Sequence, residues 1–300
     1  MALVGLLSAL VLNASALASE EGIRAQWLGV AGLAISDSET TILIDPVFTK
    51  PAIHHWIFNS SFRSDPERVR QGLDQAGIRR AQAILISHEH FDHSVDAATL
   101  SSLTGASVYG GPSLRRMLEA DRISKSSFGE LTDGVPVKVG RFKVIPYRRE
   151  HPPIFHIESL KFLPGEIRES FGFRFYDYRE GETWGYRIEH PAGTWVVDQS
   201  SHLYPGNRNQ TVRPDVYFVG IANKVSLEDL VDGNIIPVGA PRVIPLHFDF
   251  FLLQGRFFED LRMPGMEIKA IENRLGERAP GIRFIVPKRN EVIRLTAERK

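Results

Sequence analysis

The sequence predicts an α/β (α+β) fold in which short strands and helices alternate through two halves of the chain. Apolar and polar residues alternate over short runs that are separated by glycine-containing turns, as in half-buried strands. Helix-start signals stand between several of these runs. The 300 residues are 43% hydrophobic, which suffices for one large two-layer domain or two small ones. We favour a single domain over residues 19–300.

The first strands are expected between Ile23 and Asp45. Apolar residues alternate through this segment, and Gly29, Gly32 and the turn at 36–38 interrupt it. Alternation broken by turn residues is typical of antiparallel strands. The segment therefore predicts two or three of them.

A helix is expected to begin at Pro66, with Asp65 as its N-cap and Glu67 in its first turn. This helix crosses over to an apolar strand over 83–87. The remaining elements expected in the first half are a strand over 107–109 and a helix over 113–120 that Ser113 caps.

Strands dominate the second half. The elements expected there are strands over 135–147, 185–189, 194–197, 216–219, 243–246 and 282–286 and a helix over 266–275. Residues 152–180 differ from the rest, because three prolines punctuate a stretch rich in aromatic residues, which we interpret as an insertion. Its aromatic side chains either join the core, which we favour, or form a lid or acyl-binding wall over the site.

The run from His88 to His93 holds three histidines and two carboxylates directly after the apolar strand. Residues two apart in an extended backbone point the same way, so His88 and His90 could face one ion. The chain that turns after Phe91 could present Asp92 and His93 to a second ion. A polar loop that only caps a strand is the plainer alternative. The spacing indicates a metal site for two ions.

This run resembles the His-x-His-x-Asp-His signature of the metallo-β-lactamase-fold hydrolases. The resemblance spans about residues 23 to 290, and it implies a four-layer αββα sandwich with its site along one edge of the paired sheets. Such proteins carry three further ligands at the ends of later strands, and the candidates here are His151, Asp198 and His247. His156 is a rival to His151.

The resemblance implies two divalent metal ions, with zinc favoured and iron or manganese possible. His88, His90 and His151 would hold one ion. The other ion would be held by Asp92, His93 and His247, and Asp198 would bridge the two. A dimetal-bound hydroxide would then attack the substrate without a serine or cysteine nucleophile.

Five residues receive candidate roles other than metal binding. Asp92 is a candidate catalytic residue besides being a ligand, and His202 could donate a proton to the leaving group or lie at the surface. Asp45 could accept a hydrogen bond from a ligand imidazole or form a simple Asp-Pro turn. Arg148 and Arg149 could orient a phosphate, but exposed strand-end charges are the interpretation that we favour. The pair His54–His55 is expected to lie in a loop.

The opening strands, Trp27-Leu28-Gly29 and 41–46, look like those of the branch that contains ascorbate-phosphate lactonase and N-acyl-phosphatidylethanolamine phospholipase D. The chain departs from many of these relatives at two places. It has Val30 where they carry histidine, and Gln199-Ser200 after Asp198 where they carry Thr-Gly. These departures change the loops beside the site, on which substrate choice depends.

The reaction expected is hydrolysis of a phosphodiester or a lactone. Diiron oxygen reductases of this fold carry glutamate at the position of His90, which argues against electron transfer. Asp198 and the absence of cysteine argue against a dedicated β-lactamase. The aromatic insertion favours a small-molecule or lipid-like substrate. A catalytically silent protein that binds a lipid or protein partner through this insertion is the alternative.

Composition limits the partners and the location. Lysine plus arginine equal aspartate plus glutamate at 36 each, so no global field attracts nucleic acid, and none is expected as a partner. Residues 1–18 form a short apolar segment that ends in small residues, which predicts a signal peptide and export to the periplasm or the medium. No basic residue precedes Arg24, so an uncleaved anchor or a mis-assigned start stays open. Apart from such an anchor no membrane span is expected, and the sequence leaves the oligomeric state open.

Overall fold

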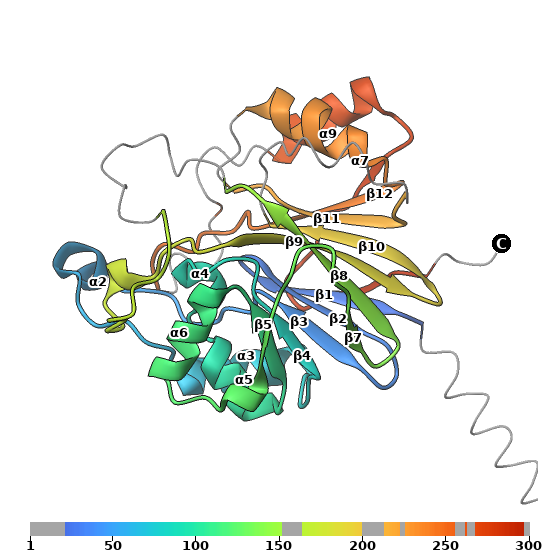
Figure 1. Ribbon diagram of the computed structural model, residues 1–300. Helices are drawn as coiled ribbons and strands as arrows, with labels where there is room; N and C mark the ends of the chain where they lie inside the picture. Colours follow the sequence, from blue (N-terminus) through green and yellow to red (C-terminus); the bar gives the residue numbers. More distant parts are fainter. Residues whose placement is uncertain are drawn as a thin grey trace, which may run out of the picture.

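The computed structural model describes residues 22–151, 164–199, 213–222, 226–255, 262 and 268–296. Two seven-stranded sheets face each other, and helices cover the outer face of each sheet (Figure 1). This is the four-layer αββα arrangement that the sequence predicts. Residues 1–18, with the expected signal peptide, lie outside the described residues.

The first sheet has the order β14-β1-β2-β3-β4-β5-β6. Its strands are β1 (Arg24–Gly29), β2 (Gly32–Ser36), β3 (Thr41–Ile44), β4 (Ala83–Leu85), β5 (Ser107–Gly110), β6 (Phe128–Glu130) and β14 (Val292–Arg294). The first three strands are antiparallel, and β3 to β6 are parallel. Strand β14, which the sequence does not predict, pairs antiparallel with β1, so the end of the described chain closes the sheet formed by its beginning.

The second sheet has the order β13-β12-β11-β10-β9-β8-β7. Its strands are β7 (Val137–Val139), β8 (Phe142–Arg149), β9 (Thr183–His190), β10 (Gly193–Asp198), β11 (Val216–Gly220), β12 (Arg242–Leu246) and β13 (Arg283–Phe284). Strands β7 to β10 are antiparallel, and β10 to β13 are parallel. The carboxyl ends of β10, β11 and β12 therefore lie at one edge of this sheet.

Helices cover both sheets on the outside (Figure 1). The helical segments are α2 (Ile53–Phe58), α3 (Pro66–Ala76), α4 (Phe91–Ser94), α5 (Ala97–Thr104), α6 (Pro112–Ala120), η1 (Lys125–Ser127), η3 (Phe175–Asp177), the π-helix η5 (Asp229–Ile235), α7 (Ile236–Val238) and α9 (Ile268–Arg278). Helices α3, α5 and α6 lie on the first sheet, and α7 and α9 lie on the second. His54 and His55, expected in a loop, lie in the short helix α2.

Two predicted helix caps have different outcomes. The carboxylate of Asp65 accepts hydrogen bonds from the backbone of Glu67 and Arg68, as predicted for the start of α3. Ser113 is expected from the sequence to cap the helix over 113–120, and this prediction is wrong. The N-cap of α6 is Gly111, and the Ser113 hydroxyl instead accepts a hydrogen bond from the backbone of Ile167 at 3.1 Å.

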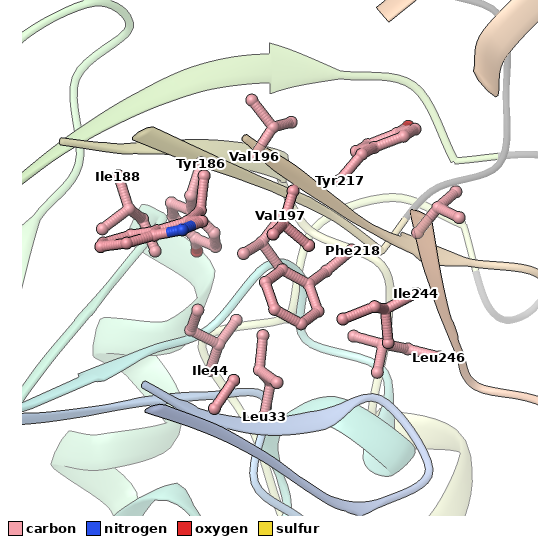
Figure 2. Packing of buried hydrophobic residues seen from close by; sticks show 14 of the residues in the cluster. Leu33, Ile44, Tyr186, Ile188, Val196, Val197, Tyr217, Phe218, Ile244 and Leu246 are labelled. Atoms are coloured by element: carbon pink, nitrogen blue, oxygen red, sulfur yellow. The ribbon is translucent and has the colours of Figure 1, made fainter. Parts of the chain in front are cut away.

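Two hydrophobic cores hold the layers together, one between the sheets and one between the first sheet and its helices. Figure 2 shows Leu33 and Ile44 of the first sheet pointing toward Val197, Phe218 and Ile244 of the second. All of these side chains are at most 1% exposed. Close packing at this contact fixes the distance between the strand ends of the two sheets, and thereby the geometry of the site.

The described part of the expected insertion belongs to the core on the helix side of the first sheet. Its buried aromatic residues are Phe171, Phe173, Phe175 and Tyr178. This agrees with the core interpretation for these four side chains. Residues 152–163 lie outside the described residues, so the lid interpretation stays a prediction for that part.

Candidate metal centre

The histidine-rich run begins where β4 ends and leads into α4. His90 is the N-cap residue of this helix, and the Ser94 hydroxyl donates to the carbonyl of Glu89 and that of His90, 3.0 Å from each. The turn from strand to helix is thus closed by local hydrogen bonds. It places His88, His90, Asp92 and His93 at the edge between the two sheets, all of them buried.

The structure gathers six of the seven predicted ligands into two groups of donor atoms. One group is His88, His90 and His151, and the other is Asp92, His93 and His247. Within each group, the donor atoms all lie within 4.8 Å of one another. Each group joins the two halves of the chain, because His151 follows β8 and His247 follows β12, both in the second sheet.

The three rings of the first group surround a common point. The ring centroids of His88, His90 and His151 are each 4.7 Å from the other two, with steep angles between the ring planes. The Ser87 hydroxyl lies 3.1 Å from Nδ1 of His88, and Nε2 of His88 is buried without a hydrogen-bond partner among the described residues. A buried nitrogen without a partner among converging imidazoles fits a metal ligand.

Electrostatics keep the His88 imidazole neutral. Burial lowers its pKa well below the ordinary histidine value, and the neighbouring imidazoles of His93, His151 and His90 lower it further. A neutral imidazole offers a lone pair, which metal coordination requires. The first group therefore fits a divalent ion in its geometry, and its His88 also fits in its protonation state.

The second group has a carboxylate partner behind its histidine. Nδ1 of His93 donates to Oδ2 of Asp45 at 2.8 Å, which leaves Nε2 directed toward Asp92. Burial alone would lower the pKa of His93, but the carboxylates of Asp45 and Asp92 raise it. Asp45 also accepts from the backbone of Ser87 at 2.7 Å. The hydrogen bond that Asp45 is expected to accept from the imidazole of a predicted ligand is therefore present.

His247 and Asp92 complete the second group. Nε2 of His247 lies 3.1 Å from Oδ2 of Asp92, and the rings of His93 and His247 stack with centroids 5.1 Å apart. Burial would raise the pKa of Asp92, but the imidazoles of His93 and His247 hold it below the ordinary value. An ionised carboxylate beside two imidazoles is a donor set that suits zinc, iron or manganese.

The loop after β1, where the chain departs from many relatives, supports His247 through its backbone. Val30 has a φ of 50°, which is rare for a β-branched residue. Its carbonyl accepts from the backbone of His247 at 2.8 Å and from the indole of Trp27 at 2.9 Å, and its N–H donates to Asp249 at 2.9 Å. These bonds hold the strained residue in place. This chain has Val30 where many relatives carry a histidine, and the backbone of Val30 positions the predicted ligand His247.

Asp198 is the predicted ligand that neither group contains. It is fully buried at the end of β10. Its Oδ1 accepts a hydrogen bond from Nε of Arg149 at 3.1 Å, and its Oδ2 forms an ion pair with Nη2 of Arg149 at 2.6 Å. The prediction of an exposed charge is therefore wrong for Arg149, whose side chain is 0% exposed. A signal was available in the sequence, because a buried strand-end carboxylate needs a cationic partner.

Arg148 differs from its neighbour. Its guanidinium contacts Glu182 at 2.6 Å and lies 4.1 Å from the centre of the Trp184 ring, and its side chain is 42% exposed. No contact with Asp198 is found for Arg148 among the described residues. His202 and His156 lie outside the described residues, so the proposed proton donor and the rival ligand stay predictions.

Glu89 is a buried carboxyl that the sequence reasoning did not single out. It is 0% exposed, and burial and the nearby Glu182 raise its pKa well above the ordinary value. Gly181, with a φ of 65°, leaves the room for it, because a Cβ there would collide with Oε2 of Glu89. The carboxyl therefore lies against the 180–182 segment, outside both donor groups.

Two facing mixed sheets with outer helices, and a site at their shared edge, define a protein of the metallo-β-lactamase fold. Residues 40–196 match the family model described as the Beta-lactamase superfamily domain, and the chain belongs to this superfamily. Within the described residues, no helix is long and apolar enough to cross a membrane.

Relatives and solved structures are similar to this chain over most or part of its length. A UPF0173 metal-dependent hydrolase of Rubrobacter xylanophilus is 25% identical over 262 residues, which cover 85% of this chain and 96% of that protein. A UPF0173 protein of Pyrococcus furiosus is 27% identical over 126 residues, or 42% of this chain and 48% of that protein. The structure of Igni18, a metallo hydrolase from Ignicoccus hospitalis, superposes with a TM-score of 0.60 at 16% identity and covers 93% of this chain and 99% of its own. At this identity, the structural likeness shows the fold alone.

Proposed function

We propose that this chain is a metal-dependent hydrolase whose two donor groups hold two divalent ions, preferably zinc. The observation that carries the proposal is the convergence of six buried or half-buried side chains, from both sheets, into two groups at one edge. When bound, two such ions would supply a water of lowered pKa and polarise the bond under attack. The names of the UPF0173 relatives support the same reaction class.

The chain's own residues orient and protect this chemistry. Asp45 and Ser87 fix the rings of His93 and His88 from behind, and Asp92 stays ionised between two imidazoles. The ring centroid of Phe251 lies 4.6 Å from that of His247, and the buried Phe91 ring lies 6.3 Å from the Phe251 ring. This apolar surround keeps bulk water from the donor atoms. Proton donation by His202 is part of the proposal.

We propose a phosphodiester or a lactone as substrate, following the branch resemblance of the opening strands. Export, with removal of residues 1–18, is also part of the proposal and follows from the small-residue ending of that segment. The alternative of a catalytically silent binding protein finds less support, because four of the five described aromatic residues of the insertion are buried.

The test is metal content per chain together with hydrolysis of bis-p-nitrophenyl phosphate, measured before and after chelation. We expect near two ions per chain and chelator-sensitive turnover. His88→Ala should lower metal content and turnover, whereas His54→Ala, an exposed histidine outside both groups, should change neither. Metal without phosphodiesterase turnover would direct the screen to lactones. A protein that retains metal but hydrolyses none of the phosphodiesters and lactones tested would support the catalytically silent alternative. A protein that binds no metal would contradict the proposed metal site.

A further inference from the structure

Asp198 projects from the face of β10 opposite to the core between the sheets. Side chains alternate along a strand, so Asp198 shares a face with Val196, whereas Val197 lies on the other face. Figure 2 shows Val197 pointing toward Leu33 and Ile44 of the first sheet, and Val196 pointing to the opposite side together with Tyr217. Tyr217 of β11 pairs with Val196 of β10, so both side chains lie on the same face of the second sheet. This is the face that the helices cover (Figure 1).

On that face the carboxylate lies in a buried polar cluster. Arg149 contacts both of its oxygens through two different nitrogens, and the Tyr217 hydroxyl lies 3.4 Å from Oδ2. The same hydroxyl donates to Oδ1 of Asn234 at 2.8 Å, which ties the cluster to η5. A fork of two charge-assisted bonds holds a carboxylate strongly in one orientation.

We propose that Arg149 is a positioning residue that competes with metal for Asp198, so that the chain binds its two ions with unequal affinity. This inference rests on the proposed metal site. The Asp198 carboxylate can bridge two ions only if it gives up part of its contact with Arg149. Each oxygen that the guanidinium engages is a poorer donor, and a second divalent ion close to a buried cation meets repulsion in a medium of low dielectric. The first ion can bind to one of the two donor groups without Asp198, so it does not compete with Arg149.

The test measures both affinities by competition with a chromophoric chelator and by calorimetry, using Zn²⁺ and then Co²⁺ on the full chain. In the wild type we expect two affinities that differ tenfold or more. Arg149→Met should raise the weaker affinity at least tenfold, because it removes the guanidinium that contacts both oxygens of the buried Asp198 carboxylate. The Co²⁺ absorption spectrum should change as the carboxylate enters the coordination sphere.

The matched control is Arg148→Met, which removes a guanidinium from the preceding position without touching Asp198, and it should leave both affinities unchanged. The double variant Arg149→Met, Asp198→Asn should lose the gain. Arg149→Lys replaces the fork by one ammonium and should give a smaller gain, which keeps the test open if the methionine variant does not fold.

The outcomes separate the two proposals. A wild type that binds no metal would remove the metal site itself. Equal wild-type affinities, or an Arg149→Met variant whose weaker affinity stays unchanged or falls while the wild type binds metal, would overturn the competition alone. A fall in particular would mean that Arg149 presents Asp198 to the metal.

Discussion

At the scale of single residues, Asp45 shows how a group outside the donor atoms controls them. It is fully buried, it has a φ of 44°, and it engages Ser87 and His93 together. The hydrogen bond to Nδ1 fixes both the tautomer and the ring orientation of His93, which leaves Nε2 for the metal. The strained backbone at Asp45 places the carboxylate where it can reach both partners.

Asp45→Asn should lower metal affinity by about 10–100-fold, because an amide no longer offers the negative charge that strengthens His93 as a donor. The measurement is chelator competition at pH 7. Asp96→Asn is the control, since Asp96 is equally buried but accepts from Phe48, Thr49 and Ser64 instead of a histidine. It should reduce stability and leave metal affinity as it is. Equal effects of the two substitutions on metal affinity would contradict a specific role for Asp45.

Single residues also show where sequence reasoning succeeds and where it stops. The ligand cluster could be predicted because four donors stand within six positions and local geometry brings them together. His151 and His247 could be placed because each follows an apolar strand. The side on which Asp198 projects could not be predicted, because it depends on strand register and on Arg149, which lies 49 residues away along the chain.

At the scale of elements, helix α3 tests whether a cap read from the sequence contributes measurable stability. Asp65→Ala should lower the free energy of unfolding by about 1 kcal/mol, since two backbone N–H groups lose their acceptor. Urea unfolding at pH 7 measures it. Asp74→Ala removes an exposed carboxylate from the same helix without touching a cap, and it should stay within about 0.5 kcal/mol of the wild type. Equal free energies of unfolding for Asp65→Ala and Asp74→Ala would contradict a stabilising role of the cap.

The turn between β2 and β3 makes stability depend on pH through Asp37. Burial would raise the pKa of Asp37, but hydrogen bonds from the backbone of Glu39 and Thr40 and the Arg141 guanidinium hold it below the ordinary value. A carboxyl with a lowered folded pKa contributes stability above its unfolded pKa of about 3.9, and this contribution is lost as the pH falls through the folded value.

Asp37→Asn should therefore cost on the order of 1 kcal/mol at pH 7, and the gap to the wild type should narrow as the pH falls below about 4. Urea midpoints at pH 7, 4 and 3 measure this. Glu39→Gln, an exposed carboxyl in the same turn, should show no such convergence. A gap that stays constant with pH would mean that Asp37 acts through shape rather than charge.

Elements with strong local signals were predicted well, and elements that depend on distant partners were not. Helix α3 carries its own cap, proline and first-turn acid. Helix α6 also exists as predicted, but the hydroxyl of Ser113 binds Ile167, which the sequence could not reveal. Helix α2 and strand β14 were missed because packing and pairing to remote segments form them, as in the donation from the Trp56 indole to the Leu252 carbonyl.

At the scale of the whole molecule, the site is a junction between the two halves. The sheets come from separate parts of the chain, except that β14 returns to β1 (Figure 1). The core between the sheets is apolar. The edge with the site is different, because buried and half-buried imidazoles there lie with their ring centroids 4.7 Å apart. An ion in either group would contact donors from both halves and link the sheets at this edge.

Metal removal should therefore lower global stability as well as activity. A ligand that binds only the folded state stabilises it by RT ln(1 + [L]/Kd), which is about 2.7 kcal/mol at a hundredfold excess over Kd. For a chain of this size, we expect chelation to lower Tm by about 5–10 °C. His151→Ala and His247→Ala each remove the metal-binding donor that the second sheet contributes to one group. Each should reduce the fall in Tm on chelation, whereas His54→Ala should preserve it.

Because apolar packing between the sheets does not depend on metal, the chelated protein should still unfold in one cooperative transition. A Tm that chelation leaves unchanged in metal-loaded protein would mean that the ions occupy the edge without linking the halves.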